Sequence, residues 1–182
     1  MRKTGTHYVV GLALGLLVFL VSYLLYPLTL VTEMSNQPPE RVAINHDDYH
    51  AKHVGRTADG RQFFLTTPFE PAFPGTSGNE FVALYLFDPE GRLLEASIDQ
   101  FGPRAGLDDS ARASVYEKRL KELGPVTFER IEVAPFTVER FGTSFGLVLR
   151  PPDDKIDVWA VEVQPGNYMA FFEPWDSGEY DT

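Results

Sequence analysis

Hydrophobic residues follow three patterns along this chain, and the first is an uninterrupted apolar run at residues 8–26. The run contains no charged residue. A helix of this length extends roughly 28 Å, close to the hydrocarbon thickness of a bilayer. A helix also satisfies its own backbone hydrogen bonds, which a lipid environment requires. The pattern therefore predicts a transmembrane helix at residues 8–30, in contact with a lipid bilayer.

The flanks of this run predict its orientation. Arg2 and Lys3 precede it, and the next basic residue after it is Arg41, so the positive side is expected in the cytoplasm. A cleaved signal peptide is the alternative, although the apolar core is longer than usual for one and bulky residues follow it. The predicted organisation is a cytoplasmic flank at residues 1–7, a signal anchor at 8–30, a linker at 31–48 and an extracytoplasmic domain at 49–182.

The second pattern consists of short apolar segments between turn residues, which is typical of β-strands. Residues 81–87 are apolar at every position, so we predict a strand that is buried on both faces. Asp88 and Gly91 suit the first and last positions of a type I turn, which predicts an antiparallel return strand at residues 92–100. An earlier hairpin is expected around Asp59 and Gly60, because glycine adopts a positive φ at little cost.

The third pattern is a helical repeat at residues 109–123, with a possible cap at Asp108 or Asp109 and a stop at Gly124. The predicted fold class is therefore α+β: after the single transmembrane helix, a mostly antiparallel β-sheet of about seven or eight short strands with one packed α-helix. The apolar stripe expected on the helix comprises Ala113, Tyr116, Leu120 and Leu123. The wider expected core comprises Phe63, Leu65, Phe81, Val82, Leu84, Leu86, Ile98, Tyr116, Leu120, Phe128, Ile131, Leu147, Val161 and Phe171.

Composition adds that the chain is acidic, with a formal net charge of −10. After Lys155 there is no further basic residue. An acidic surface repels the phosphate backbone, so nucleic acid is not an expected partner. The chain has no cysteine, which excludes disulfides, thiolate metal sites and cysteine nucleophiles.

Three of the four histidines lie within eight residues, and this is the densest group of potential metal ligands. On a helix, His46, His50 and His53 would share one face, and imidazole is a common ligand of transition metals. With Asp48 they form a candidate site for a divalent transition metal. Lys52 argues against this site because it places a positive charge beside it, and a strand at this position would point His50 and His53 to opposite faces.

The sequence contains no recognisable catalytic motif. We therefore expect no catalytic residues and no cofactor, and whether the protein is an enzyme is left open, with a binding or structural role favoured. The predicted function is a single-pass membrane protein whose acidic extracytoplasmic domain binds an unknown protein partner or has a structural role. Gly11 and Gly15 form a GxxxG motif that suits a homodimer. The alternative is a metal-binding or hydrolytic domain that uses the histidine cluster.

Overall fold

The computed structural model describes residues 37–166, 168–175 and 178–180, and strand β5 (Asn79–Phe87) is central to the first sheet. β5 pairs antiparallel with β3 (Gln62–Thr66) on one side and with β6 (Leu93–Gly102) on the other. Next to β3 lies β2 (His53–Thr57), followed by the edge strand β7 (Val126–Phe128), and β4 (Phe69–Glu70) pairs with the start of β5. The central position explains why every residue after Asn79 in β5 is buried.

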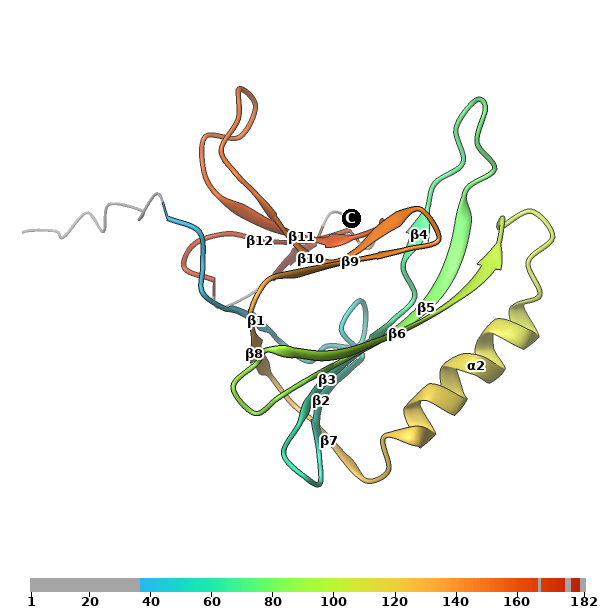
Figure 1. Ribbon diagram of the computed structural model, residues 1–182, viewed down its shortest axis with the longest axis horizontal. Helices are drawn as coiled ribbons and strands as arrows, with labels where there is room; N and C mark the ends of the chain where they lie inside the picture. Colours follow the sequence, from blue (N-terminus) through green and yellow to red (C-terminus); the bar gives the residue numbers. More distant parts are fainter. Residues whose placement is uncertain (1–36, 167, 176–177, 181–182) are drawn as a thin grey trace, which may run out of the picture. The chain divides into compact units, whose positions relative to one another are not determined.

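A second antiparallel sheet follows in the chain. It contains β9 (Phe136–Arg140), β10 (Thr143–Arg150), β11 (Ala160–Gln164), β12 (Met169–Phe171) and β13 (Gly178–Tyr180), arranged side by side in chain order. A short ribbon of β1 (Val42–Ile44) and β8 (Ile131–Val133) completes the strands of the described part (Figure 1). All of these pairings are antiparallel, so the predicted sheet type is confirmed.

The helix α2 (Asp109–Glu122) covers one face of the first sheet. Asp108 caps it, since its side chain accepts a hydrogen bond from the Ala111 backbone N–H at 2.9 Å. The helix and its cap lie where the periodicity predicts them, and the single packed α-helix of the predicted α+β class is confirmed. The stripe differs at one position, because Ala113 is exposed while Val115 packs on the sheet.

Successive side chains of β5 point to opposite faces, and this alternation produces two separate cores. Phe81 and Tyr85 point into the layer between the two sheets, whereas Val82 and Leu84 point toward α2. The layer between the sheets is rich in aromatic residues, and Phe81 and Phe145 meet edge-on at 4.9 Å. One strand thus supplies both cores.

Three details of the predicted domain differ in the structure. The strands form two packed sheets and a ribbon instead of one sheet, because the short strands after residue 135 pair with one another. Val42–Ile44, inside the predicted linker 31–48, is a buried strand of the domain. Phe128 was expected in the core but is 41% exposed, since β7 lies at the edge of its sheet.

The predicted cytoplasmic flank 1–7, the predicted transmembrane helix 8–30 and the glycine pair Gly11 and Gly15 all lie outside the described residues. Within the described part of the chain, no helix has the length and apolar character needed to cross a bilayer. The likeness to a known protein, described with the functional site, contradicts the predicted single-pass localisation with a cytoplasmic N-terminus and an outside domain. Contact with a bilayer and a homodimer through the glycine pair are unsupported.

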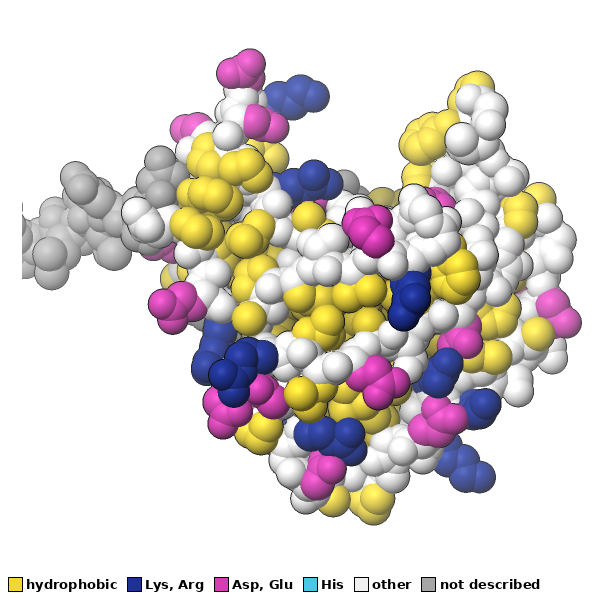
Figure 2. Space-filling view, viewed as in Figure 1, with side chains coloured by type: hydrophobic (Ala, Val, Ile, Leu, Met, Phe, Trp, Pro, Cys, Tyr) yellow, Lys and Arg dark blue, Asp and Glu magenta, His cyan; other side chains and the backbone are white. Residues whose placement is uncertain are grey.

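The surface shows how charge is distributed over the domain. On the face seen in Figure 2, acidic and basic side chains alternate in small mixed groups, although the chain as a whole is acidic. Ion pairs account for much of this mixing, for example Arg150 with Glu162 at 2.8 Å and Arg56 with Glu129 at 2.9 Å. A place where positive charge exceeds negative charge is therefore informative in this protein.

Candidate functional site

The side chains of the predicted metal ligands do not converge on one point in the structure. His46 stacks on Phe128 with ring centroids 5.6 Å apart, while His53 Nδ1 lies 2.6 Å from the hydroxyl of Tyr116. His50 contacts the ring of Tyr49 instead. Within the residues described, no group of three His, Cys, Asp or Glu side chains could hold a metal ion.

The local backbone explains this separation. Residues 48–52 form bends and turns rather than a helix, so the spacing of the histidines does not place them on one face. Asp47 fixes the turn, because its carboxylate accepts hydrogen bonds from the backbone N–H groups of Tyr49 at 2.7 Å and Ala51 at 3.0 Å. Asp48 is exposed. The metal site of His46, His50, His53 and Asp48 stays a prediction that these contacts do not favour.

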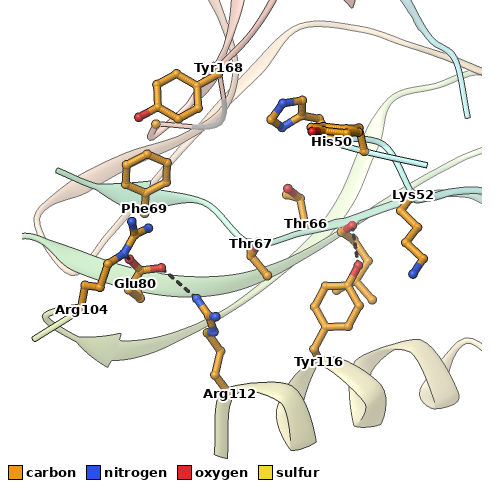
Figure 3. A pocket seen from close by; sticks show the side chains of 13 residues that line it. His50, Lys52, Thr66, Thr67, Phe69, Glu80, Arg104, Arg112, Tyr116 and Tyr168 are labelled. Atoms are coloured by element: carbon orange, nitrogen blue, oxygen red, sulfur yellow. Dashed lines mark hydrogen bonds and ion pairs between the residues drawn. The ribbon is translucent and has the colours of Figure 1, made fainter. Parts of the chain in front are cut away.

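A cavity of about 260 Å³ lies beside this turn instead (Figure 3). The end of β3, the strand β4, the start of β5 and the first turns of α2 all contribute to its wall, as does the hairpin that follows β11. Its lining residues are Tyr49, His50, Lys52, Leu65, Thr66, Thr67, Phe69, Glu80, Arg104, Arg112, Tyr116, Gly166 and Tyr168.

Glu80 is the buried charge in this wall, with a side chain that is 4% exposed. Two arginines pair with its two oxygens: Arg104 Nε donates to Oε1 at 2.6 Å, and Arg112 Nη1 donates to Oε2 at 2.9 Å. Glu80 faces the helix because it has the same parity in β5 as Val82, and Arg112 lies in the first part of α2. The two charge-assisted hydrogen bonds compensate for the burial of this carboxylate.

The cavity wall carries excess positive charge. Among the described residues that line it, Lys52, Arg104 and Arg112 supply three cations, whereas Glu80 is the single carboxylate. Lys52 is exposed and has no ion-pair partner within the described part of the chain. The formal balance of the lining residues is thus +2, or +1 with Asp109, the partner of Arg112 just outside the wall, in a protein whose overall charge is −10.

Arg104 and Arg112 differ in their exposure and in how many hydrogen bonds they form with other residues of the protein. Arg112 also donates from Nη2 to Asp109 Oδ1 at 2.9 Å, and it is 28% exposed. Arg104 is 72% exposed and pairs through its Nε, so its terminal N–H groups face the solvent side of the site. The hydrogen bond that Arg104 donates to Glu80 raises the pKa of Arg104, which keeps its guanidinium charged.

Aromatic rings form much of the remaining wall. The Arg104 guanidinium lies over the Phe69 ring at 5.2 Å, and Phe69 in turn contacts Tyr168 at 5.3 Å. Figure 3 shows Phe69 and Tyr168 on one side of the cavity and His50 on the other, with Arg112 and Tyr116 rising from the helix below. The arrangement offers positive donors next to exposed ring faces.

Tyr116 connects this cavity to His53. Its hydroxyl lies 2.6 Å from His53 Nδ1 and 3.4 Å from the Leu65 carbonyl oxygen, and it can donate to only one of them at a time. Burial lowers the pKa of His53, and the neighbouring positive charge of Lys52 lowers it further. The neutral imidazole accepts at Nδ1 when the Tyr116 hydroxyl donates to it, and donates from Nδ1 when that hydroxyl donates to the Leu65 carbonyl.

The comparisons with known proteins add one distant likeness. No family model matches the chain, and no solved structure matches it. The chain is similar to Protein sco1 of Schizosaccharomyces pombe, with 28% identity over 115 residues, which cover 56% of this chain and 42% of that protein. The chain therefore spans less than half of that relative's length, and at this identity and coverage the likeness does not establish a family.

This likeness corrects the function predicted from the sequence. The sequence predicted a single-pass membrane protein with an extracytoplasmic binding or structural domain. The alternative was a metal-binding or hydrolytic domain. Neither prediction included a likeness to a protein of this kind. The likeness contradicts that function. An unknown protein partner is compatible with the likeness, and whether a metal or other cofactor binds stays a prediction.

Sequence reasoning missed the residues that form the cavity. Lys52 was considered only as a charge beside the histidines, and Glu80, Arg104 and Arg112 were not singled out. One signal was present: Glu80 directly precedes the fully apolar run 81–87, so a carboxylate there enters a buried strand and needs cationic partners. The identity of those partners depends on how the helix packs, which the sequence pattern does not specify.

Proposed function

We propose that the domain binds a small organic anion in the cavity at Lys52, Arg104 and Arg112. The observation that carries this proposal is the excess of cations over carboxylates around a concave site in an acidic protein. Ion pairing neutralises most other arginines of the described part, whereas here one buried carboxylate holds two guanidinium groups in place. Such positioned donors bind a carboxylate or phosphate without further ordering of the side chains.

The role of each residue follows from its exposure. Glu80 orients the two arginines and does not itself touch the ligand, because both of its oxygens are already paired. Arg104 offers its terminal N–H groups, and Lys52 offers an ammonium that forms no ion pair with a described residue. The cavity of about 260 Å³ lies just below the range of about 300–1,000 Å³ typical of drug-sized ligands, so the ligand is small.

The test compares benzoate with benzamide, a neutral molecule of nearly the same shape, by isothermal titration calorimetry on the purified 182-residue chain at constant ionic strength. Benzoate is expected to bind with a Kd on the order of 1 mM or tighter, and benzamide at least about tenfold more weakly, which corresponds to about 1.4 kcal/mol. Equal binding of the two molecules, or no binding of either, contradicts the proposal.

Two lysine variants localise the binding. Lys52→Gln removes an exposed cation from the cavity wall and is expected to weaken benzoate binding by about fivefold. Lys121→Gln is the matched control, because Lys121 is also exposed and lies on α2 outside the cavity. Neither substitution breaks an ion pair, so the melting temperature should change little in both. An equal loss of affinity in the two variants would indicate a diffuse charge effect.

A further inference from the structure

We infer that the anionic ligand carries a single aromatic ring, held between the Phe69–Tyr168 pair and the Tyr49–His50 pair while its anionic group meets Arg104. This inference rests on the proposed function and adds the chemical class of the ligand. The exposure and placement of the aromatic rings around the cavity support this inference, because a simple inorganic anion does not need such rings for its binding.

The rings at the rim are unusually exposed for their size. Tyr49 is 82% exposed and Tyr168 is 54% exposed, and both line the cavity. Tyrosines are costly to leave in water, since each offers a large apolar face. Two of them at the mouth of one cavity, each in contact with a second ring, form a surface that a flat aromatic ligand covers.

Tyr168 is also held in a backbone conformation that few residues adopt. Its φ is 60°, in the left-handed region, where a side chain with a Cβ costs free energy. Strained residues of this kind are concentrated at ligand-binding sites, where the surrounding fold holds them in position. The strain places the exposed ring of Tyr168 beside Phe69, at a centroid distance of 5.3 Å.

The position of the cation determines where the ring of the ligand lies. The Arg104 guanidinium is 5.2 Å from the Phe69 ring centroid, so an acid group bound to Arg104 is adjacent to that ring. An acid whose ring is bonded directly to the carboxyl carbon therefore brings its own ring alongside Phe69 and Tyr168. The cavity of about 260 Å³ suits a ligand of roughly one ring.

The decisive experiment compares benzoate with cyclohexanecarboxylate on the full chain, again by calorimetry at constant ionic strength. The two acids have the same charge and carbon count, but only benzoate has a π-face. Aromatic stacking predicts that benzoate binds about fivefold tighter. If burial of apolar surface alone decided the affinity, the saturated and more apolar ring would bind at least as tightly, so the sign of the difference tests the inference.

A matched pair of variants tests the role of Tyr168. Tyr168→Asn removes the ring and keeps a residue that tolerates the left-handed region, and it should abolish the preference for benzoate. Phe141→Asn is the control, since Phe141 is also 54% exposed with a positive φ of 54° but lies outside the cavity. The control should retain the full fivefold preference.

The outcomes separate this inference from the proposed function. If both acids bind equally well, or the saturated acid binds more tightly, the aromatic class is overturned while anion binding stands. If neither acid binds, the proposed function fails and this inference fails with it. If the preference for benzoate survives in Tyr168→Asn, or is lost equally in Phe141→Asn, the assignment of the ring pair is overturned.

Discussion

The two faces of strand β5 differ in whether their buried polar groups have hydrogen-bond partners. On the face toward α2, Glu80 precedes the apolar residues, and both of its carboxylate oxygens are paired with arginines. On the face toward the second sheet, Tyr85 is 1% exposed, and its hydroxyl has no hydrogen-bond partner among the described residues. The two groups lie five residues apart on one strand.

This difference indicates which face serves binding. The face toward α2 is apolar except at its start, where the paired carboxylate of Glu80 lines a cavity and positions arginines that reach solvent. The Tyr85 side is packed with aromatic rings, among them Phe136 at 5.0 Å, and contributes stability through apolar burial. A buried hydroxyl without a partner costs free energy, and the cost is tolerated because the rest of the Tyr85 ring is well packed.

A second contrast lies along α2 itself. Arg112 near its start and Arg119 near its end both reach from the helix to a carboxylate on the first sheet. Arg119 binds Asp99 at 2.9 Å and 3.2 Å and also Glu122, so two carboxylates surround one guanidinium. At Glu80 two guanidinium groups share one buried carboxylate, and Arg112 pairs with Asp109 as well.

The largest expected effect comes from removing the charge of Glu80. Glu80→Gln leaves two arginines without their buried carboxylate and should lower the free energy of unfolding by about 2 kcal/mol, measured by urea denaturation. Asp99→Asn removes the more exposed carboxylate of the other ion pair and should cost less than about 1 kcal/mol. Equal losses in the two variants would remove the distinction between the buried and the exposed pair.

The next effect concerns ligand binding. Arg112→Gln should weaken benzoate binding by about tenfold, because it removes one cation from the cavity wall and releases Glu80 from one of its partners. Arg119→Gln changes the same helix by the same substitution outside the cavity, and benzoate affinity should stay within about twofold of the parent chain. Both are measured by calorimetry, with melting curves to confirm that the variants are folded. A tenfold loss in Arg119→Gln would refute the localisation.

The sequence was sufficient for the parts of this fold that depend on local pattern. The apolar run 81–87 predicted a strand that is buried on both faces, and this is confirmed. The turn from Asp88 to Gly91 is also confirmed, since the Gly91 N–H donates to the Asp88 carbonyl at 2.9 Å and Gly91 has a φ of 85°. Both features rest on residues close together in the chain.

The parts that depend on distant contacts were not predicted. His46, His50 and His53 are close in sequence, but a turn fixed by Asp47 sends their side chains to different neighbours. The cavity combines Lys52 with Arg104 and Arg112, which come from separate segments and meet only after α2 packs on the sheet. Apolar periodicity predicted that the helix packs there, but not which charged residue at its start would face Glu80.

Tyr85→Phe tests the apolar face of β5 and should act in the opposite direction to Glu80→Gln. Removing a buried hydroxyl without a partner is expected to raise the free energy of unfolding by about 1 kcal/mol, as measured by urea denaturation. Tyr116→Phe is the matched control on the helix side, where the hydroxyl is bonded to His53, and it should lower stability by about 1 kcal/mol. A decrease in stability for Tyr85→Phe would show that its hydroxyl has a favourable partner.

The smallest expected effect is the pH dependence that comes from His53. Burial, with a further contribution from Lys52, lowers its pKa in the folded state below the unfolded value of about 6.5. The unfolded chain therefore binds a proton at higher pH than the folded one, so this contribution to stability is complete above about pH 6.5. It decreases as the pH falls from there toward the folded pKa.

Comparing the parent chain with His53→Gln isolates this contribution. Glu117 opposes the shift and the site is partly open to solvent, so the decrease is limited to about 0.5 kcal/mol. The difference in unfolding free energy between the two chains should shrink from pH 7.5 to pH 5. His50→Gln serves as the control at a neighbouring histidine. A difference that grows as the pH falls would mean that the charged form of His53 is favoured in the folded state. His53 Nδ1–H would then donate to the Tyr116 hydroxyl.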